Sequence, residues 1–324
     1  MREFAAVSTA NRACALLYSF LRDHNEGVWL VPVNVCPDVP LTFCAAKVQF
    51  EFVDIDSETF CIDEEETINR LIKVSSKYAG IVYVRTYGYM SDTNVFFNKC
   101  HEIKPSFQII DDRCLCMPSF SPNMYGADMV LYSTGHCKQI DLGGGGLAYY
   151  KRYESYKVDR ELVYNATDES SIYKKSYEAN EPMESIPQGW LKMDNYIDYQ
   201  LYIEKIESEK KDRIKIRENI NAVYDRNLSD FIKCPSHFQD WRYNIRVPSH
   251  LKEPILNDLF ANKLFASSHY HSANRLFDND NYVNSESLFA SVLNLFNDKY
   301  YSVEKAEQTC SIINKYCNNQ YDTI

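Results

Sequence analysis

The chain has 324 residues, 45% of them hydrophobic, and a formal net charge of -10 at pH 7. This composition predicts a globular protein with a large core, and it argues against nucleic-acid binding or a basic membrane-binding surface, because both need clustered lysine and arginine. No apolar segment reaches the roughly 18 residues of a membrane span, and the N-terminal residues lack the pattern of a cleaved signal. Eleven scattered cysteines, an odd number, favour reduced thiols, so we expect a cytoplasmic protein.

The first half of the chain alternates short β-rich runs with segments of helical spacing. Helices are predicted within 11–24, 40–48, 64–78 and 91–105, and strands within 27–35, 50–56, 80–88, 106–112 and 127–134. Apolar strands separated by helices indicate an α/β fold, with a mostly parallel sheet covered on both faces. Ligands of such sheets bind at the carboxyl ends of the strands, where Asp54, Asp56, Asp111, Asp112 and Ser133 are expected.

From about residue 151 the sequence becomes charged and rich in tyrosine. Residues 202–228 predict one long helix with a solvated charged face. Beyond it, strands are predicted within 241–248 and 290–298, and helices within 251–265 and 303–319. We therefore expect a large α/β domain over 1–195, whose last part (151–195) is a linker, and a second unit over 196–324 that holds the long helix and a smaller α+β domain.

The stretch "YSTGHCKQIDLGGGG" (132–146) places Lys138 close to four glycines. The simple interpretation is a solvated lysine in a surface loop; the alternative is a covalent anchor on a backbone that closely approaches a cofactor. A pyridoxal phosphate (PLP) enzyme needs such a lysine to bind the cofactor aldehyde, a carboxylate such as Asp112 to keep the ring nitrogen protonated, and a phosphate site. Ser133 and a helix N-terminus capped by Ser8 or Thr9 are the candidates for that phosphate site.

Five segments in chain order resemble the motifs of the DegT/StrS-type sugar aminotransferases, which are PLP enzymes of fold-type I. They read "STANRACALL", "VPVNVCPDVPLTFCAAKVQFEFVDID", "IVYVRTYG", "IIDDRCL" and "YSTGHCKQIDLGGGG". The resemblance implies the fold-type I sheet of seven strands. It also implies that Lys138 is the Schiff-base lysine, that Asp112 pairs with the pyridine nitrogen, and that Ser133, Thr9 and Ala10 contact the phosphate.

Some positions depart from the family pattern. Cys36 stands where an aromatic side chain commonly stacks on the cofactor, and Leu115 stands where glutamine or histidine follows the aspartate. The asparagine that the family donates across the subunit interface is not visible, and residues 189–193 are the nearest segment. Even so, the resemblance implies a homodimer with active sites at the interface.

The implied activity is transfer of the amino group of L-glutamate to a keto sugar on a nucleotide carrier, as in amino-sugar or surface polysaccharide (lipopolysaccharide) biosynthesis. The cofactor would alternate between PLP and its pyridoxamine form. Two alternatives remain: a non-catalytic homologue with a binding or regulatory role, and a PLP-dependent sugar dehydratase, although the dehydrating members have histidine at the position of Lys138. His136 is interpreted as a neighbour in the loop, and His269 and His271 as part of a substrate-facing or structural loop, since no third metal ligand is evident.

Overall fold

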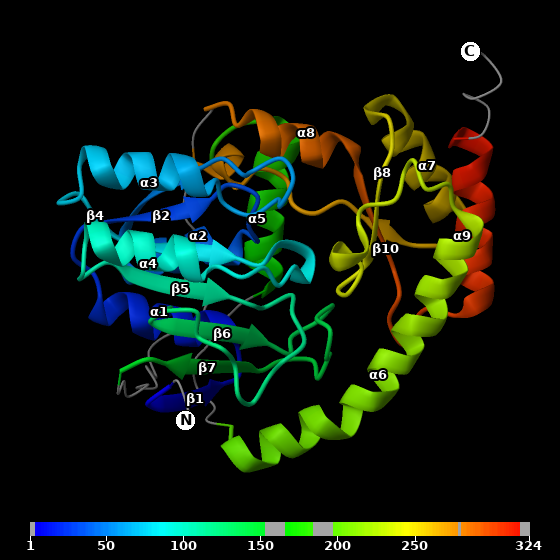
Figure 1. Cartoon of the computed structure of the whole chain (residues 1–324). Coiled ribbons are helices and arrows are strands. Elements are labelled where there is room, and N and C mark those ends of the chain that lie inside the picture. The colour runs from blue at the N-terminus through cyan, green and yellow to red at the C-terminus, as the bar shows by residue number, and fades with distance from the viewer. Residues whose placement is uncertain (1–3, 153–165, 184–196, 278–279, 318–324) are drawn as a thin grey trace.

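The computed structural model describes residues 4–152, 166–183, 197–277 and 280–317, and its centre is a seven-stranded sheet (Figure 1). The strands lie in the order β1-β7-β6-β5-β4-β2-β3. Neighbours from β6 to β3 pair in parallel, whereas β7 is antiparallel to both β6 and β1. The predicted mostly parallel sheet of seven strands is therefore confirmed. The bounds are β1 (Ala6–Ala10), β2 (Val28–Pro32), β3 (Gln49–Val53), β4 (Tyr78–Val84), β5 (Gln108–Asp112), β6 (Met129–Ser133) and β7 (Gly146–Tyr150).

Helices cover both faces of this sheet. One face packs on α1 (Ala13–Asp23) and α2 (Asp38–Ala46), and the other on α3 (Glu64–Lys73), α4 (Asn94–Ile103) and the start of α6 (Tyr199–Asn227). Side chains alternate between the two cores along each strand, so Ile110 and Leu131 face α1 and α2 while Ile109 and Val130 face the opposite side. Burial of both faces explains why the central strands are almost continuously apolar.

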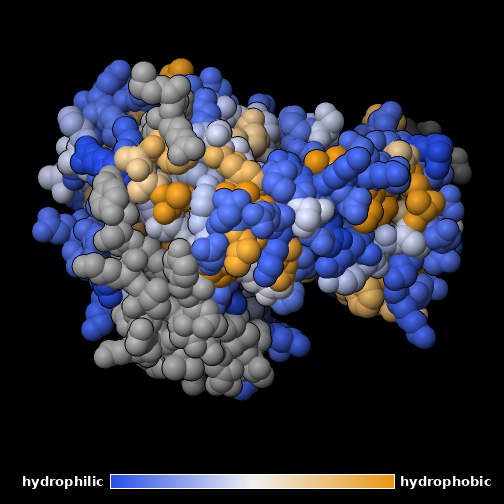
Figure 2. Space-filling model, turned by 90° about the horizontal axis from the view of Figure 1, so that it is seen from below, coloured by the Kyte–Doolittle hydropathy of each residue, from blue (hydrophilic) through white to orange (hydrophobic). Residues whose placement is uncertain are grey.

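A smaller α+β part follows, as predicted. Its antiparallel sheet has the order β8 (Tyr243–Arg246), β10 (Val292–Leu295), β9 (Ala266–Ser267), and it packs against α7 (Ser249–Ala261), α9 (Val303–Cys317) and the second half of α6. In Figure 1, α6 runs from beneath the large sheet to the smaller part, and Figure 2 shows the two parts as separate lobes seen from below. The remaining elements are α5 (Ala166–Ala179), α8 (Val283–Ser291) and the short turns η1 (Thr86–Gly88), η2 (Ser236–Phe238) and η3 (Ala273–Leu276).

The start of the chain differs from the sequence-based prediction. Ser8 and Thr9 lie inside strand β1, and α1 begins only at Ala13, with Arg12 at the position before the helix. The prediction of Ser8 or Thr9 as a helix cap was therefore wrong. Residues 6–10 are extended because they pair with β7, from Ala6 opposite Tyr150 to Ala10 opposite Gly146. A partner about 140 residues away leaves no local signal in the sequence.

The glycine run is explained by close packing around β7. A Cβ atom on Gly146 would lie 2.6 Å from the backbone nitrogen of Ala13, and one on Gly145 would lie 2.4 Å from Oγ1 of Thr134. Gly145 also has a φ of +109°, which side chains disfavour. The end of β6, the start of β7 and the start of α1 are therefore in direct contact, and glycine is what permits that contact.

Two further observations concern the whole chain. Within the described ranges, no helix has the length and apolar character needed to cross a membrane. All eleven cysteines belong to described residues, and none of them forms a disulfide.

The contact between β7 and α1 predicts a stability difference between two glycine variants. Gly146→Ala should lower the free energy of unfolding by about 1–3 kcal/mol, because the new methyl group forces the helix and the strand apart. Gly135→Ala is the control, since its Cβ would only reach Oγ of Ser133 at 3.4 Å. Urea denaturation of both variants provides the comparison, and equal stabilities would contradict the close packing.

Candidate functional site

The structure brings Asp112 and Lys138 together on the face of the sheet covered by α1 and α2. Asp112 is the last residue of β5, is buried, and accepts a hydrogen bond from the backbone N–H of Cys114 at 2.9 Å. Lys138 is partly exposed in the loop between β6 and β7, where it interacts electrostatically with Asp112, Cys114 and Cys36. Both strand ends point to the same edge of the sheet, which is where ligands of this architecture bind.

Burial and nearby charges set the protonation of this pair. Burial raises the pKa of Asp112, and the Cys114 N–H group and the charge of Lys138 only partly oppose that effect. Burial also opposes the charge of Lys138, but the surrounding thiol and carboxyl groups raise its pKa above the ordinary value. Lys138 is therefore an ammonium group in this arrangement. A cation beside Asp112 would favour the ionised carboxylate.

Ser133 lies on the same face, next to the N-terminus of α1. Its neighbour Leu131 pairs with Asp112, and residues two apart on a strand share a face. The Ser133 Oγ atom accepts a hydrogen bond from the N–H of Gly135 at 3.2 Å and donates to the carbonyl of Gly145 at 3.5 Å. Ser133 pairs with Gly146, which in turn contacts the start of α1. A hydroxyl and the first N–H groups of a helix therefore meet here, a combination that suits an anion.

Thr9 and Ala10, the other two residues predicted to contact a phosphate, occupy different places. Thr9 pairs with Leu147, which belongs to the opposite core, and its hydroxyl donates to the carbonyl of Ile197 at 2.6 Å. Thr9 thus points away from Ser133, and a phosphate-binding role does not fit its position. Ala10 is buried on the correct face, opposite Gly146, but its side chain belongs to the core beneath α1.

Cys36 and Leu115, the two departures from the family pattern, lie in different surroundings. Cys36 follows β2 and is partly exposed near Lys138, with Tyr177 and Tyr270 as further neighbours. Leu115 instead buries its side chain in a cluster of apolar residues at the junction with the smaller part. Its backbone carbonyl accepts a hydrogen bond from Nε2 of Gln139 at 3.0 Å. Leu115 therefore supports the loop that carries Lys138.

That loop is held by residues from α6 and the smaller part. The indole N–H of Trp241 donates to the carbonyl of Cys137 at 2.7 Å, and Arg217 donates to the carbonyl of Gln139 at 3.3 Å. Earlier in α6, the hydroxyl of Tyr202 bonds that of Thr134 at 2.6 Å. Two contacts from α6 and one from Trp241 beyond it therefore hold the loop that carries Lys138.

Sequence reasoning missed several neighbours of Lys138. Asp38, the first residue of α2, and Tyr270 both belong to the group of interacting side chains around Lys138 and Asp112. The segment that carries Tyr270 is anchored by a bond from the hydroxyl of Tyr87 to the carbonyl of His269, and by one from the N–H of Ala273 to the carbonyl of Val33 at 2.7 Å. Asp38 follows Cys36 by two residues, so its sequence position pointed to the site. Tyr270 is more than 200 residues away in the sequence, and only the tertiary fold brings it there.

His269 and His271, the pair with the spacing of metal ligands, have other surroundings, as does His136. Burial, together with the charges of Arg242 and Lys138, lowers the pKa of His269 to about 4, so its imidazole is neutral. His271 stacks on Tyr177, with ring centroids 4.3 Å apart. His136 is exposed, 3.7 Å from the carboxylate of Asp141. In the part of the chain that the structure describes, no group of three histidine, cysteine or acidic side chains is arranged to hold a metal ion.

A buried ion cluster occupies the opposite face of β5. Asp111 accepts hydrogen bonds from Arg85 at 2.8 Å on each carboxylate oxygen and from Arg113 at 2.7 Å, and the three side chains are almost completely inaccessible to solvent. Burial alone would raise the pKa of Asp111, but the two guanidinium groups hold it below its ordinary value. Asp111 therefore ties β4 to β5 and the following loop, while Asp112 faces Lys138.

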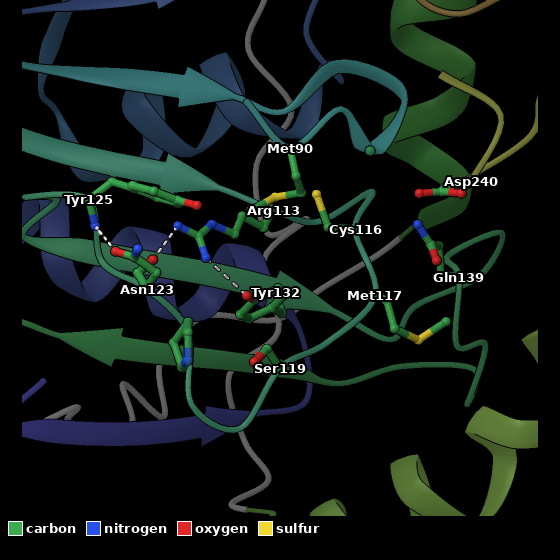
Figure 3. A pocket seen from close by; sticks show the side chains of 12 residues that line it. Met90, Arg113, Cys116, Met117, Ser119, Asn123, Tyr125, Tyr132, Gln139 and Asp240 are labelled. Atoms are coloured by element: carbon green, nitrogen blue, oxygen red, sulfur yellow. Dashed lines mark hydrogen bonds between the residues drawn. The ribbon is translucent and has the colours of Figure 1, made fainter. Parts of the chain in front are cut away.

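A cavity of about 310 Å³ adjoins this cluster (Figure 3). Arg113 lies at its wall, bonded to the hydroxyl of Tyr132 at 3.3 Å and the carbonyl of Asn123 at 2.6 Å. Gln139, the residue after Lys138, also lines the cavity. The remaining lining residues are Gly88, Met90, Cys116, Met117, Ser119, Pro122, Tyr125 and Asp240.

Comparison with solved structures identifies the fold. The sequence matches no protein-family model and no curated protein sequence. The PMP form of Spr1654 from Streptococcus pneumoniae has a TM-score of 0.73 at 16% identity, over 98% of this chain and 89% of that one. PseC of Helicobacter pylori, an aminotransferase involved in the biosynthesis of pseudoaminic acid, has a TM-score of 0.71 at 15% identity, over 98% and 88%. A DegT DnrJ EryC1 StrS aminotransferase from Brucella abortus has a TM-score of 0.68 at 16% identity, over 97% and 86%.

These similarities extend over nearly the whole chain, including the smaller part. The fold is therefore that of the PLP-dependent aminotransferases, as the sequence motifs implied. The division into units at 195 and 196 stays a prediction, and residues 189–193 lie outside the described ranges.

The same substitution should destabilise the protein far more at Asp111 than at Asp112. Asp111→Asn leaves two buried guanidinium groups without their carboxylate, so it should lower the free energy of unfolding by about 3–5 kcal/mol. Asp112→Asn should change it by less than about 1 kcal/mol, because the amide oxygen still accepts from the Cys114 N–H, and the partly exposed Lys138 keeps Asp38 as a nearby carboxylate. Urea denaturation of the cofactor-depleted variants compares them, and similar losses would contradict the division of roles.

Proposed function

We propose that this protein is a PLP-dependent aminotransferase. The observation that carries the proposal is the placement of Lys138 and Asp112 on one face of the sheet, at the carboxyl ends of β5 and β6, with Ser133 beside the start of α1. The donor set fits the cofactor: an amine for its aldehyde, a buried carboxylate for its ring nitrogen, and a hydroxyl with helix N–H groups for its phosphate. The fold of the similar solved structures supports the same conclusion.

Bound PLP would supply an electron-accepting ring that stabilises negative charge on the substrate α-carbon. Lys138 would hold the cofactor covalently and, once released by the amino donor, move the proton at the α-carbon. The neutral amine would take this proton and the ammonium form would return it; the thiol and carboxyl groups around Lys138 raise its pKa and so favour the ammonium form. Asp112 would accept the hydrogen bond of the protonated ring nitrogen, and this cation would shift the pKa of Asp112 downward, against the effect of burial.

For the substrates, we propose L-glutamate as the amino donor and a nucleotide-linked keto sugar as the acceptor. The printed names of similar structures support the sugar: PseC is described as acting in pseudoaminic acid biosynthesis, and CalS13 of Micromonospora echinospora as a sugar aminotransferase. A homodimer with sites at the subunit interface, located in the cytoplasm, completes the proposal. Lysine at position 138 favours transamination over dehydration.

Covalent attachment to Lys138 is the first test. The protein incubated with PLP should show a visible absorbance band that glutamate bleaches, and borohydride followed by peptide mass analysis should place the pyridoxyl group on Lys138. Lys138→Ala should bind the cofactor without a covalent bond and be inactive. Lys151→Ala is the control, because Lys151 is exposed beyond β7 and should leave both the band and the activity intact. Labelling of another lysine, or a band that glutamate does not alter, would overturn the transaminase assignment.

Ser133 and Thr9 offer a matched pair of hydroxyl groups on opposite faces. Ser133→Ala should weaken PLP binding by about 1.5–3 kcal/mol, the contribution of a hydrogen bond to a charged group. Thr9→Val should leave the dissociation constant unchanged, because the Thr9 hydroxyl bonds Ile197 on the other side of the sheet. Titration of the depleted variants with PLP compares them. A larger loss in Thr9→Val would show that the phosphate site is elsewhere.

A further inference from the structure

Arg217, in the second half of α6, is a buried cation without a carboxylate of its own. The residue is only 7% exposed, and its Nη2 atom donates a hydrogen bond to the backbone carbonyl of Gln139 at 3.3 Å. Its Nε atom is shut off from solvent and has no acceptor. Within the described ranges, Nη1 makes no hydrogen bond and the guanidinium group forms no ion pair. Burial of a charged group is costly unless the charge is paired, so an anionic partner is expected here.

The two arginines nearest in charge to Arg217 do have carboxylate partners. Arg242 donates to Asp298 at 2.8 Å, and Arg213 pairs with Glu209 one turn earlier in α6. Burial lowers the pKa of Arg217 to about 10, an effect that nearby carboxylates oppose only partly and that the charges of Arg242 and Arg213 reinforce. Arg217 therefore stays charged at neutral pH, and its charge is the one that lacks a direct counter-ion in this group of three.

The cavity of Figure 3 lies beside Arg217. Gln139, whose carbonyl Arg217 bonds, lines this cavity of about 310 Å³ together with Asp240, at the end away from Tyr125. Asp240 is exposed and acts electrostatically on Arg217 without forming an ion pair with it. Arg113, at the cavity wall, is already bonded to a buried carboxylate. Arg217 is therefore the cation of this region that retains donors for a ligand, and Nη1 is not among its atoms shut off from solvent.

We propose that Arg217 binds an oxyanion, at the junction of α6, the loop that carries Lys138 and the cavity of Figure 3. The planar N–H donors of a guanidinium group suit the oxygens of a phosphate or carboxylate group. Three sources carry this chemistry: free phosphate, the diphosphate of a nucleotide-linked ligand, and a carboxylic acid. The inference goes beyond the proposed function and does not require it, because no bound cofactor takes part in the binding.

Thermal unfolding with three probes tests this site. Protein incubated with PLP is titrated with inorganic phosphate, uridine diphosphate or succinate, with potassium chloride holding the ionic strength constant. The wild-type protein should show a saturable rise in Tm with at least one probe, and the probe that binds most tightly identifies the source. Arg217→Gln should bind that probe about 10- to 100-fold more weakly, because it loses a hydrogen bond between two charged groups. A purely structural role would instead lower Tm equally at every probe concentration.

Two further variants complete the experiment. Arg226→Gln makes the same change of charge at an exposed position of α6 and should leave the response to the probe unaltered. Asp240→Asn should bind the probe about two- to fivefold more tightly, because it removes a carboxylate that competes for the charge of Arg217. A Tm that no probe raises, or a rise that Arg217→Gln retains in full, would overturn the inference. Should Arg217→Gln not fold, Asp240→Asn decides, and unchanged affinity in that variant would overturn it. Failure to attach PLP to Lys138 would refute only the proposed function.

Discussion

The buried carboxylate of Asp111 is the interaction on which the geometry of the site depends. Two guanidinium groups, from the end of β4 and from the loop after β5, converge on its oxygens in a region without solvent. This ion pairing fixes the face of the sheet on which the side chain of Asp111 lies. Because side chains alternate along a strand, Asp112 must then face α1 and α2. Because Asp111 is bonded to the two arginines, Asp112 is the carboxylate that lies near Lys138.

A second constraint acts on the loop between β6 and β7. On one side the glycine run brings this loop against α1, and on the other side Trp241 and Arg217 hold its backbone carbonyls. Lys138 is therefore positioned by contacts from the start of α1 and by Arg217 and Trp241, which come much later in the sequence. A loop held only by its own sequence would pay far more conformational entropy to present a side chain so precisely.

The sequence predicted those parts of the fold whose signal is local. Strands such as β4 and β5 were predictable because burial of both faces gives continuous apolar runs, and α6 because its spacing is helical over many turns. The strand nature of residues 6–10 was not predictable, since it depends on pairing with β7. The same error placed the expected helix cap at Ser8 or Thr9, whereas Arg12 is the residue that directly precedes α1. Tyr270 was missed for a similar reason, because only the tertiary fold brings its segment to the end of β2.

The continuity of α6 has a consequence for motion. This helix contacts the lysine loop through Tyr202 and Arg217 and then enters the core of the smaller part through Ile220, Val223 and Tyr224. Over its 29 residues it contains neither proline nor glycine, the residues at which helices usually bend. A helix without such a bend moves as a rigid rod, so a rotation at one end displaces the other end. Any rotation of the smaller part would therefore act on the backbone around Lys138 through Tyr202 and Arg217.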